Sequence, residues 1–566
     1  MQYQSIENRI YCDIIGLSFF RRYNMSFKEK PVRGSTPSPD HIMLSISDDA
    51  KTTMTVTWRT STDVPTGYAL CRKDGCNDEI RAEAISEIFE SDIDVSYIHW
   101  AKITGLEPGT KYYYTCGNDE NRSDEFYFET EPENLTKFKF IAISDHQKSK
   151  NFNKPDYSEL QDWLNEVLKM HPDTRFILTG GDNTDCGQHE VQWNGMFSGL
   201  TGIIEHIPYM MTLGNHDNRG FEVYSEEECI GRYYSEPAEF FGKQFKYSYP
   251  YNGPKDWKTE NYSFNYGNCH FVVYGINGPE DVNEWSLEDH KSHDKTWTFG
   301  AYHFPIYYSG PELSNDDAYP MMRESMEKCD VLFSGHEHNF SRSYPIRNEE
   351  LFDKPSQGTI HYMLGNGNNN PPGSRTLDKV WHCSFYPQEE YNQMVAIVEV
   401  DGNKVTMTSV LNDGRIVDEC IIDKEKDDIF PHRVAPIFKQ TRLMFKGVDL
   451  GLCMAITPPE EKDGVWYAPM ATMVSFIGGL SVKEKGKVTC EVYGHKATFF
   501  EGSDVALADG EEFKLNAKVY RGKENQLYIP IEGFTKIFGM KWAYAKRNNF
   551  ISVEYINEDK PVTIQP

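Results

Sequence analysis

The sequence predicts a multidomain protein with an N-terminal β-sandwich, a central α/β sandwich of mixed sheets flanked by helices, and a C-terminal α+β repeat module. Residues 53–58 alternate apolar residues with threonines, which is the two-residue period of a strand. From residue 137 onward, apolar strand-like runs alternate with helical stripes, as in α/β proteins. After residue 440, a pattern of strand, helix, glycine turn and strand pair occurs twice.

The composition limits the classes of partner. The chain has 566 residues, of which 39% are hydrophobic and 14% aromatic, enough for several globular domains with a large core. Its 58 basic and 86 acidic residues give a net charge of -28, which opposes contact with nucleic-acid backbones and anionic membrane surfaces. We therefore expect no nucleic-acid partner, and a polyanionic substrate would need local metal charge.

The cysteines and the N-terminal residues predict a cytoplasmic protein. The 12 cysteines contain no Cys-x-x-Cys pair, and although Cys71 and Cys76 are close enough to pair across a loop, free thiols are expected. The first 22 residues hold one short apolar run without a basic start or a small-residue cleavage site. We find no stretch long and apolar enough for a transmembrane segment.

Changes in composition mark the first two expected domains. Residues 1–38 are polar and end in a stretch with Pro31, Gly34 and Pro37, which predicts a flexible leader, and residues 39–130 carry the strand pattern of the β-sandwich. Tyr112 follows a Pro108-Gly109 turn, an arrangement that resembles the tyrosine corner of fibronectin type III sandwiches. In such a corner the tyrosine hydroxyl bonds back to the upstream backbone.

Residues 131–422 are expected to form the central domain. The strand 138–144 precedes a helix whose apolar residues between Leu160 and Leu168 form one buried stripe. An aromatic-rich insert at 240–262 is expected to pack over one side, and the hairpin 394–408 is expected to close the sheet. Four further strands are expected at 175–179, 209–213, 297–302 and 331–333.

Polar blocks follow these strands, at the sheet edge where α/β proteins place their sites. They supply carboxylate oxygens, an amide oxygen and imidazole nitrogens, which are the ligands that two adjacent divalent or trivalent metals need. The blocks are Asp145 within Ile143–Gln147, Gly181-Asp182, Gly214-Asn215-His216-Asp217, His303 within Tyr302–Pro305, and Gly335-His336-Glu337-His338.

The order and spacing of these blocks resemble calcineurin-like metallophosphoesterases, in particular purple acid phosphatases, over about residues 39–420. The resemblance implies a dinuclear centre in which Asp182 bridges both metals and acts in catalysis. His216 is the expected catalytic proton donor, Asn215 and His216 are expected to bind substrate, and Arg219 is a further phosphate-binding candidate. The pattern places Asp145 and His338 on the first metal and Asn215, His303 and His336 on the second.

The first site departs from the family pattern. Purple acid phosphatases carry a tyrosinate three residues after the bridging aspartate, where this chain has Asp185, and the wider metallophosphoesterases usually have histidine where it has Gln147. Asp185 and Gln147 are therefore candidate oxygen ligands, which suit Mn, Mg or Fe(II), with Zn also compatible. His146, His189 and His293 match no position of the pattern and are expected at the surface or behind the ligands.

The last third of the chain is expected to be separate. The charged run 423–428 predicts a linker over residues 423–440. In residues 441–566, Trp466–Pro469 recurs as Leu527–Pro530, an offset of 528 − 467 = 61. This module resembles the copper amine oxidase N-terminal-like domain. No copper is expected because the repeat carries no metal cluster, but the resemblance implies an extracellular or cell-surface location as the alternative to the cytoplasm.

The predicted function is hydrolysis of phosphomonoesters, with water activated between the two metals. The expected substrates are phosphorylated small molecules or phosphoproteins. One alternative is a phosphodiesterase or nucleotide hydrolase. Another is a non-catalytic binding or attachment protein with a degenerate metal site.

Overall fold

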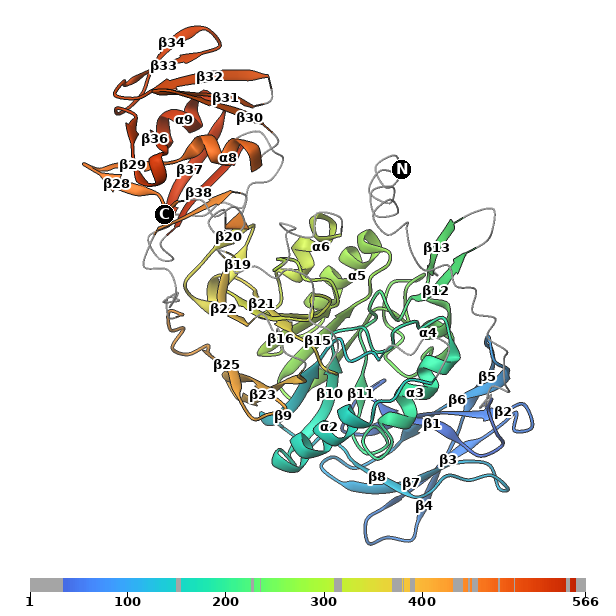
Figure 1. Cartoon of the computed structure of the whole chain (residues 1–566). Helices are drawn as coiled ribbons and strands as arrows, with labels where there is room; N and C mark the ends of the chain where they lie inside the picture. Colours follow the sequence, from blue (N-terminus) through green and yellow to red (C-terminus); the bar gives the residue numbers. More distant parts are fainter. Residues whose placement is uncertain are drawn as a thin grey trace. The chain divides into compact units, whose positions relative to one another are not determined.

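The computed structural model describes most of the chain between residues 34 and 555 (Figure 1). Most of the expected leader and the linker residues 431–440 lie outside the described residues. The described ranges are 34–148, 154–224, 229–234, 236–309, 318–368, 379, 381–386, 392–430, 441–445, 448–449, 457–476, 479–492, 494–545 and 550–555.

Two four-stranded antiparallel sheets form the N-terminal sandwich, drawn in blue in Figure 1. Met54, Val56 and Trp58 lie in the core between the sheets, as their alternation predicts. One sheet contains β1 (Asp40–Ser45), β2 (Thr53–Ser61), β6 (Val95–Thr104) and β5 (Ile85–Glu90). The other contains β4 (Glu79–Glu83), β3 (Tyr68–Lys73), β7 (Lys111–Gly117) and β8 (Phe126–Glu129).

The tyrosine at the start of β7 makes the backbone contact expected of a tyrosine corner. The amide nitrogen of Glu107 donates a hydrogen bond of 2.8 Å to the Tyr112 hydroxyl. Tyr112 is also buried and stacks on Phe128 of the neighbouring strand, with ring centroids 5.7 Å apart. The contact fixes the turn that leads into β7.

Two mixed sheets form the central domain. β9, β10 and β11 run parallel in one sheet, and β15, β16, β17 and β21 run parallel in the other. The first sheet has the order β11 (Tyr209–Met210), β10 (Thr174–Thr179), β9 (Lys137–Ile143), β23 (Met394–Asp401), β24 (Lys404–Leu411), β25 (Ile416–Asp423). The second has the order β14 (Tyr262–Tyr266), β15 (Cys269–Tyr274), β16 (Trp297–Tyr302), β17 (Val331–Ser334), β21 (Ile360–Leu364), β18 (Phe340–Ser343), β22 (His382–Tyr386).

Aromatic rings fill the space between these two sheets. Phe140 on β9 stacks on Phe176 of the same sheet at 5.0 Å, and its ring meets Phe271 and Phe299 of the other sheet edge-on at 5.3 and 5.6 Å. All four side chains are fully buried or nearly so. Removing one such ring from a core lowers the free energy of unfolding by about 3 to 5 kcal/mol, so this cluster contributes strongly to holding the two sheets together.

Helices cover the sheets on their outer sides (Figure 1). In α2 (Ser158–Met170), Leu160, Trp163, Leu164 and Val167 are buried in the central core, which confirms the predicted stripe. The other described helices of the domain are α3 (Glu190–Gly199), α4 (Glu239–Gln244), α5 (Pro279–Lys291) and α6 (Tyr319–Met326). Two short hairpins, β12 (Arg219–Tyr224) with β13 (Cys229–Tyr234) and β19 (Ile346–Arg347) with β20 (Glu350–Leu351), complete it.

The closing edge of the first sheet lies one strand further than expected. β23 and β24 form the predicted hairpin, but β25 pairs with β24 and provides the edge. The charged run that predicted a linker begins at the end of β25, and Lys424 forms an ion pair of 2.7 Å with the partly buried Asp330. The charged residues of this run did not indicate, from the sequence, that one of them pairs with the central domain.

The aromatic insert at 240–262 packs into the central core. Phe245 lies against Trp193 with ring centroids 5.2 Å apart, and Tyr249 stacks on Tyr262 at 4.5 Å. Phe241, Phe245, Tyr249 and Tyr262 are all buried. These side chains therefore serve packing, as expected.

Glu205 gives the stability of this domain a pH dependence. The residue is 5% exposed, and burial raises its pKa to about 7, although the Gly202 amide donates a 2.7 Å hydrogen bond to its carboxylate. A raised carboxyl pKa means that its stabilising contribution is complete below pH 4.5 and is lost as the pH rises through 7. The uncharged E205Q variant should therefore gain stability relative to the wild type between pH 5 and 8, by up to about 3 kcal/mol.

Urea unfolding at several pH values measures this difference. E419Q, which changes an exposed glutamate, is the matched control and should show no such trend. If the difference in unfolding free energy between E205Q and the wild type does not change with pH, the proposed effect of the Glu205 charge is wrong.

In the last third of the chain, two segments share one order of elements. β29 (Val465–Ala468) and α8 (Met470–Phe476) precede a strand pair, as do β36 (Leu527–Pro530) and α9 (Ile531–Ile537). β29 and β36 pair with each other, so the repeated segments form one small sheet. The other strands are β26 (Arg442–Phe445), β27 (Val448–Asp449), β28 (Glu460–Lys462), β30 (Leu480–Glu484), β31 (Lys487–Val492), β32 (His495–Phe500), β33 (Val505–Ala508), β34 (Glu511–Lys514), β35 (Tyr520–Arg521), β37 (Met540–Ala545) and β38 (Phe550–Tyr555). The resemblance to the amine oxidase module stays a prediction.

Two other expectations concern single features. Cys71 and Cys76 are both free thiols. Among the described helices, none has the length and apolar character needed to cross a membrane.

Candidate metal centre

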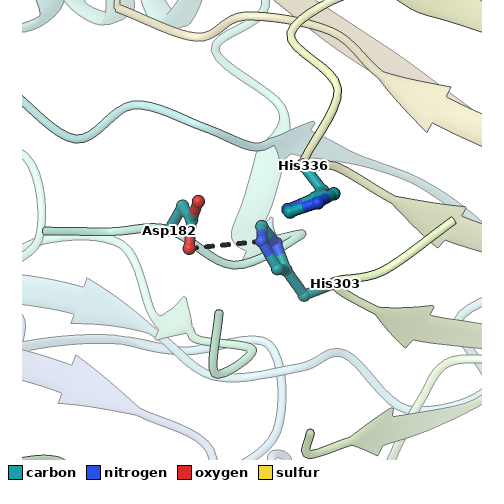
Figure 2. A group of neighbouring side chains, drawn as sticks. All are labelled: Asp182, His303 and His336. Atoms are coloured by element: carbon teal, nitrogen blue, oxygen red, sulfur yellow. Dashed lines mark ion pairs between the residues drawn. The ribbon is translucent and has the colours of Figure 1, made fainter. Parts of the chain in front are cut away.

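The predicted ligands meet where strands of the two central sheets end. Asp145 and Asp182 follow β9 and β10 of the first sheet, whereas His303 and His336 follow β16 and β17 of the second. Parallel strands present their carboxyl ends at one edge, so the two sheets bring these side chains together. Figure 2 shows Asp182, His303 and His336, whose ligand atoms lie within 4.8 Å of one another.

Four of these residues have left-handed backbones that non-glycine residues rarely adopt. The φ angles are 51° at Asp145, 53° at Asp182, 77° at His336 and 52° at His338. Each costs free energy, and such residues concentrate at functional sites. The turns after the strands therefore aim these side chains inward.

Glycines permit the close approach of the ligand turns. A Cβ atom at Gly335 would overlap the side chains of Ser144 and Asp145, and one at Gly181 would overlap the His303 ring. Gly181 also has a φ of 96°. Space therefore requires glycine at both positions, and the backbone conformation requires it at Gly181 as well.

Asn215, His303, His336 and one oxygen of Asp182 form what we call the second site. The Asn215 Oδ1 atom lies 2.9 Å from His303 Nε2 and 3.0 Å from His336 Nδ1. His303 Nε2 lies 3.2 Å from Asp182 Oδ1, the ion pair drawn in Figure 2. Three kinds of donor atom therefore converge on one small volume.

The His303 ring is held in one orientation. Its Nδ1 atom lies 2.8 Å from the Gly180 carbonyl oxygen, which can only accept, so Nδ1 carries a proton and Nε2 faces the site. A carbonyl behind a histidine is the usual arrangement around protein metals. Burial alone would lower the pKa of His303, but the Asp182 and Asp145 carboxylates raise it to about 9.

Asp182 lies at the centre of the cluster and is 1% exposed. Burial alone would raise the pKa of its carboxyl, but the charges of His216 and His303 hold it well below its usual range. Its Oδ1 atom faces His303 and accepts a 2.9 Å hydrogen bond from the His216 amide. Its Oδ2 atom lies 3.5 Å from Gln147 Nε2. The two oxygens of one carboxylate thus face different sets of side chains.

Asp145, Gln147, His338 and the second oxygen of Asp182 form what we call the first site. His338 Nε2 lies 3.5 Å from Asp145 Oδ1 and 3.4 Å from Gln147 Nε2. Both Asp145 oxygens also accept hydrogen bonds from the His336 amide, at 2.8 and 2.9 Å. The His336 backbone therefore connects the two sites.

Asp185 supports His216. His216 Nδ1 is 2.9 Å from Asp185 Oδ1, and Arg219 donates to the same oxygen at 3.2 Å. Burial alone would lower the pKa of His216, but the carboxylates of Asp182 and Asp185 raise it. Asp185 is one of the two candidate oxygen ligands of the first metal, and in the structure its carboxylate contacts His216 and the 6% exposed Arg219.

Asp217 organises the loops and had no predicted role. Its carboxylate accepts hydrogen bonds from Asn183 Nδ2 and the Thr184 amide, both at 2.8 Å, and from the Gly214 amide at 3.0 Å. Burial, followed by the charge of Asp182, raises its pKa to about 6. Its place in the Gly214–Asp217 block was a signal for it, but two of these three partners, Asn183 and Thr184, lie more than 30 residues away in the sequence.

The donor atoms fit a pair of metal ions. Octahedral ions with bonds of about 2.1 Å hold neighbouring ligand atoms about 3.0 Å apart, and tetrahedral ions hold them about 3.4 Å apart. The second site has separations of 2.9, 3.0 and 3.2 Å, and the first has 3.4 and 3.5 Å. The oxygens and nitrogens present suit Mn, Fe, Zn or Mg.

The three histidines that match no position of the family pattern have partners other than the predicted ligands. His146 is fully buried, with its Nε2 atom 2.7 Å from the Tyr209 hydroxyl. His189 lies 3.0 Å from Asp92, and His293 stacks on His270 at 3.8 Å.

Comparisons with known proteins agree with this geometry. Residues 39–130 match the purple acid phosphatase N-terminal domain, and residues 138–340 match the calcineurin-like phosphoesterase model. The second range includes all of the blocks with predicted ligands.

Curated relatives come from Arabidopsis thaliana. Purple acid phosphatase 15 is 26% identical over 311 residues, 48% of this chain and 54% of that protein. Probable inactive purple acid phosphatase 1 is 25% identical over 375 residues, 59% of each chain. The chain thus spans little more than half the length of these relatives.

A solved structure shares the fold. The purple acid phosphatase PPD1 from yellow lupin (Lupinus luteus) seeds superposes with a TM-score of 0.56 at 18% identity, covering 68% of this chain and 74% of that one. The chain therefore contains a purple acid phosphatase N-terminal domain followed by a calcineurin-like phosphoesterase domain, and purple acid phosphatases are its relatives.

Proposed function

We propose that the protein hydrolyses phosphomonoesters of small molecules or phosphoproteins with a dinuclear metal centre. One observation carries the proposal. The two oxygens of Asp182 face separate donor sets, Oδ1 toward His303 at 3.2 Å and Oδ2 toward Gln147 at 3.5 Å. A single carboxylate between two such sets suits two adjacent ions, the arrangement used for in-line displacement at phosphorus.

The side chains of the protein divide the remaining tasks. When bound, the metal pair supplies an activated water and neutralises charge on the phosphoryl oxygens. Asp145, Asp182 and His338 would hold the first ion, and Asp182, Asn215, His303 and His336 the second. His216 is held by Asp185 through Nδ1, so its Nε2 faces the site, 3.7 Å from Asp182 Oδ2, where it would give a proton to the leaving-group oxygen.

Hydrolysis by metal-stripped protein after addition of Mn, Fe(II), Zn or Mg tests the proposal. We expect p-nitrophenyl phosphate to be hydrolysed by at least one reconstituted form, and bis(p-nitrophenyl) phosphate and ATP to be poorer substrates. His336→Ala should remove the activity because it deletes one imidazole ligand of the second site. His495→Ala is the matched control, since that histidine is exposed in the C-terminal module.

Other outcomes favour the alternatives. Preference for the diester or for ATP would indicate a phosphodiesterase or nucleotide hydrolase. No hydrolysis with any metal between pH 5 and 8, together with fewer than one tightly held ion per chain, would favour a binding or attachment protein.

A further inference from the structure

We propose that Gln147 is a ligand of the first metal, through its side-chain oxygen, and that Asp185 is not. This inference rests on the proposed dinuclear centre but concerns metal binding alone. It makes the first site one of three oxygen donors and one nitrogen, from Asp145, Asp182, Gln147 and His338.

The backbone places Gln147 beside the bridging residue. The Asp145 amide donates to the Gly181 carbonyl, and the Gln147 amide donates to the Asp182 carbonyl, both at 3.1 Å. The chain after β9 therefore stays paired with the chain after β10. The side chains of both residues end beside the same imidazole, since His338 Nε2 lies 3.5 Å from Asp145 Oδ1 and 3.4 Å from Gln147 Nε2.

The side chain of Gln147 ends inside the first site. It is 3% exposed, and its Nε2 atom lies 3.5 Å from Asp182 Oδ2 and 3.4 Å from His338 Nε2. Those separations lie close to the spacing of about 3.0 to 3.4 Å between neighbouring ligands of octahedral and tetrahedral ions. The amide oxygen and nitrogen have nearly the same shape, so rotation of the amide by half a turn puts the oxygen where Nε2 now lies.

Asp185 is already committed elsewhere. Its Oδ1 atom contacts His216 Nδ1 at 2.9 Å and Arg219 at 3.2 Å, and its backbone carbonyl accepts from the same two side chains at 3.0 and 3.1 Å. Turning toward the first site would break both side-chain contacts and leave a buried arginine without this carboxylate. The geometry therefore separates the two candidates that the sequence left equal.

A neutral amide changes which ions the first site prefers. Oxygen donors suit Mn, Mg and Fe(II), whereas each added imidazole favours Zn. No tyrosine stands three residues after Asp182, so ferric ion at this site would have no tyrosinate there to give a visible charge-transfer band. We expect the loaded protein to be colourless.

Metal titration of the metal-stripped full chain, with Zn and Mn and a competing chelator, tests the proposal. The wild type should bind two ions per chain. Gln147→Leu, which keeps the size and removes the donors, should weaken one of the two ions at least about tenfold and leave the other unchanged. Gln147→His should tighten Zn binding at the first site at least about tenfold and change Mn binding less.

Two variants serve as controls for the metal titration. Gln161→Leu changes a glutamine on α2 whose side-chain amide contacts the Thr201 carbonyl. This variant should bind both metal ions as the wild type does. Asp185→Asn should also keep both ions. The inference is overturned if Gln147→Leu binds two ions with wild-type affinity, if Gln147→His leaves Zn binding unchanged, or if the wild type binds fewer than two ions. Two bound ions without hydrolysis would instead contradict the proposed function and leave the ligand assignment standing.

Discussion

Asp182→Asn is expected to lower kcat/KM for p-nitrophenyl phosphate by at least about 10³-fold, equivalent to about 4 kcal/mol. The carboxylate is 1% exposed and its two oxygens face different donor sets. An amide offers one oxygen and no negative charge, so it cannot serve both sites or offset the repulsion between two cations. Elemental analysis should show the metal content falling from two ions per chain to one or fewer.

The control for this change is Asp413→Asn, which alters an exposed aspartate paired with Arg415. It should leave activity and metal content unchanged. Circular dichroism should show that Asp182→Asn remains folded, since the strands around it are held by the aromatic core between the sheets. An Asp182→Asn protein with two ions and more than a tenth of the wild-type activity would contradict the bridging role.

The second large effect is expected at His216 and depends on the leaving group. His216→Asn should lower kcat for an alkyl phosphate by about 10² to 10⁴-fold, because an alkoxide needs a proton as it departs. The loss for p-nitrophenyl phosphate should be less than about tenfold, because p-nitrophenolate leaves without one. Steady-state kinetics with a series of leaving groups of rising pKa tests this difference. In the variant, kcat should fall more steeply with the pKa of the leaving group than in the wild type.

Asp185 is expected to act through His216 as a positioning residue. Asp185→Asn should reduce kcat for alkyl phosphates by about 10 to 100-fold. Because both changes act on one proton donor, the double variant should be no slower than His216→Asn alone. Equal losses for alkyl and aryl substrates in His216→Asn would assign it to phosphate binding rather than proton transfer, and additive losses would separate Asp185 from it.

Elements with a strong local period could be predicted from the sequence. The stripe from Leu160 to Val167 is buried in α2, and the strand expected at 297–302 is β16. The strand expected at 209–213 is shorter, covering two residues in β11, since residues 211–214 are not paired as a strand and lead into the turn that begins at Asn215. The edge strand β25 was missed because its exposed and buried residues alternate only partly and a charged run follows it.

Some residues of the candidate site could be predicted from the sequence and others could not. Asp145, Asp182, Asn215, His303, His336 and His338 could be proposed as ligands because each stands just after an apolar run, at a glycine or within a short motif. Asp217 and the partner of His216 could not, because their hydrogen bonds join loops about 30 residues apart. Sequence distance carries no information about which of two nearby carboxyl groups turns toward a given histidine.

The sequence by itself determined the domain order, the donor types and the absence of a tyrosine three residues after Asp182. The tertiary structure decided that Asp185 holds His216 and that Gln147 faces Asp182 and His338. The reason is physical: residue types and short periods are local properties of the chain. The direction of a buried side chain depends on which hydrogen-bond partners the folded loops bring within about 3 Å of it.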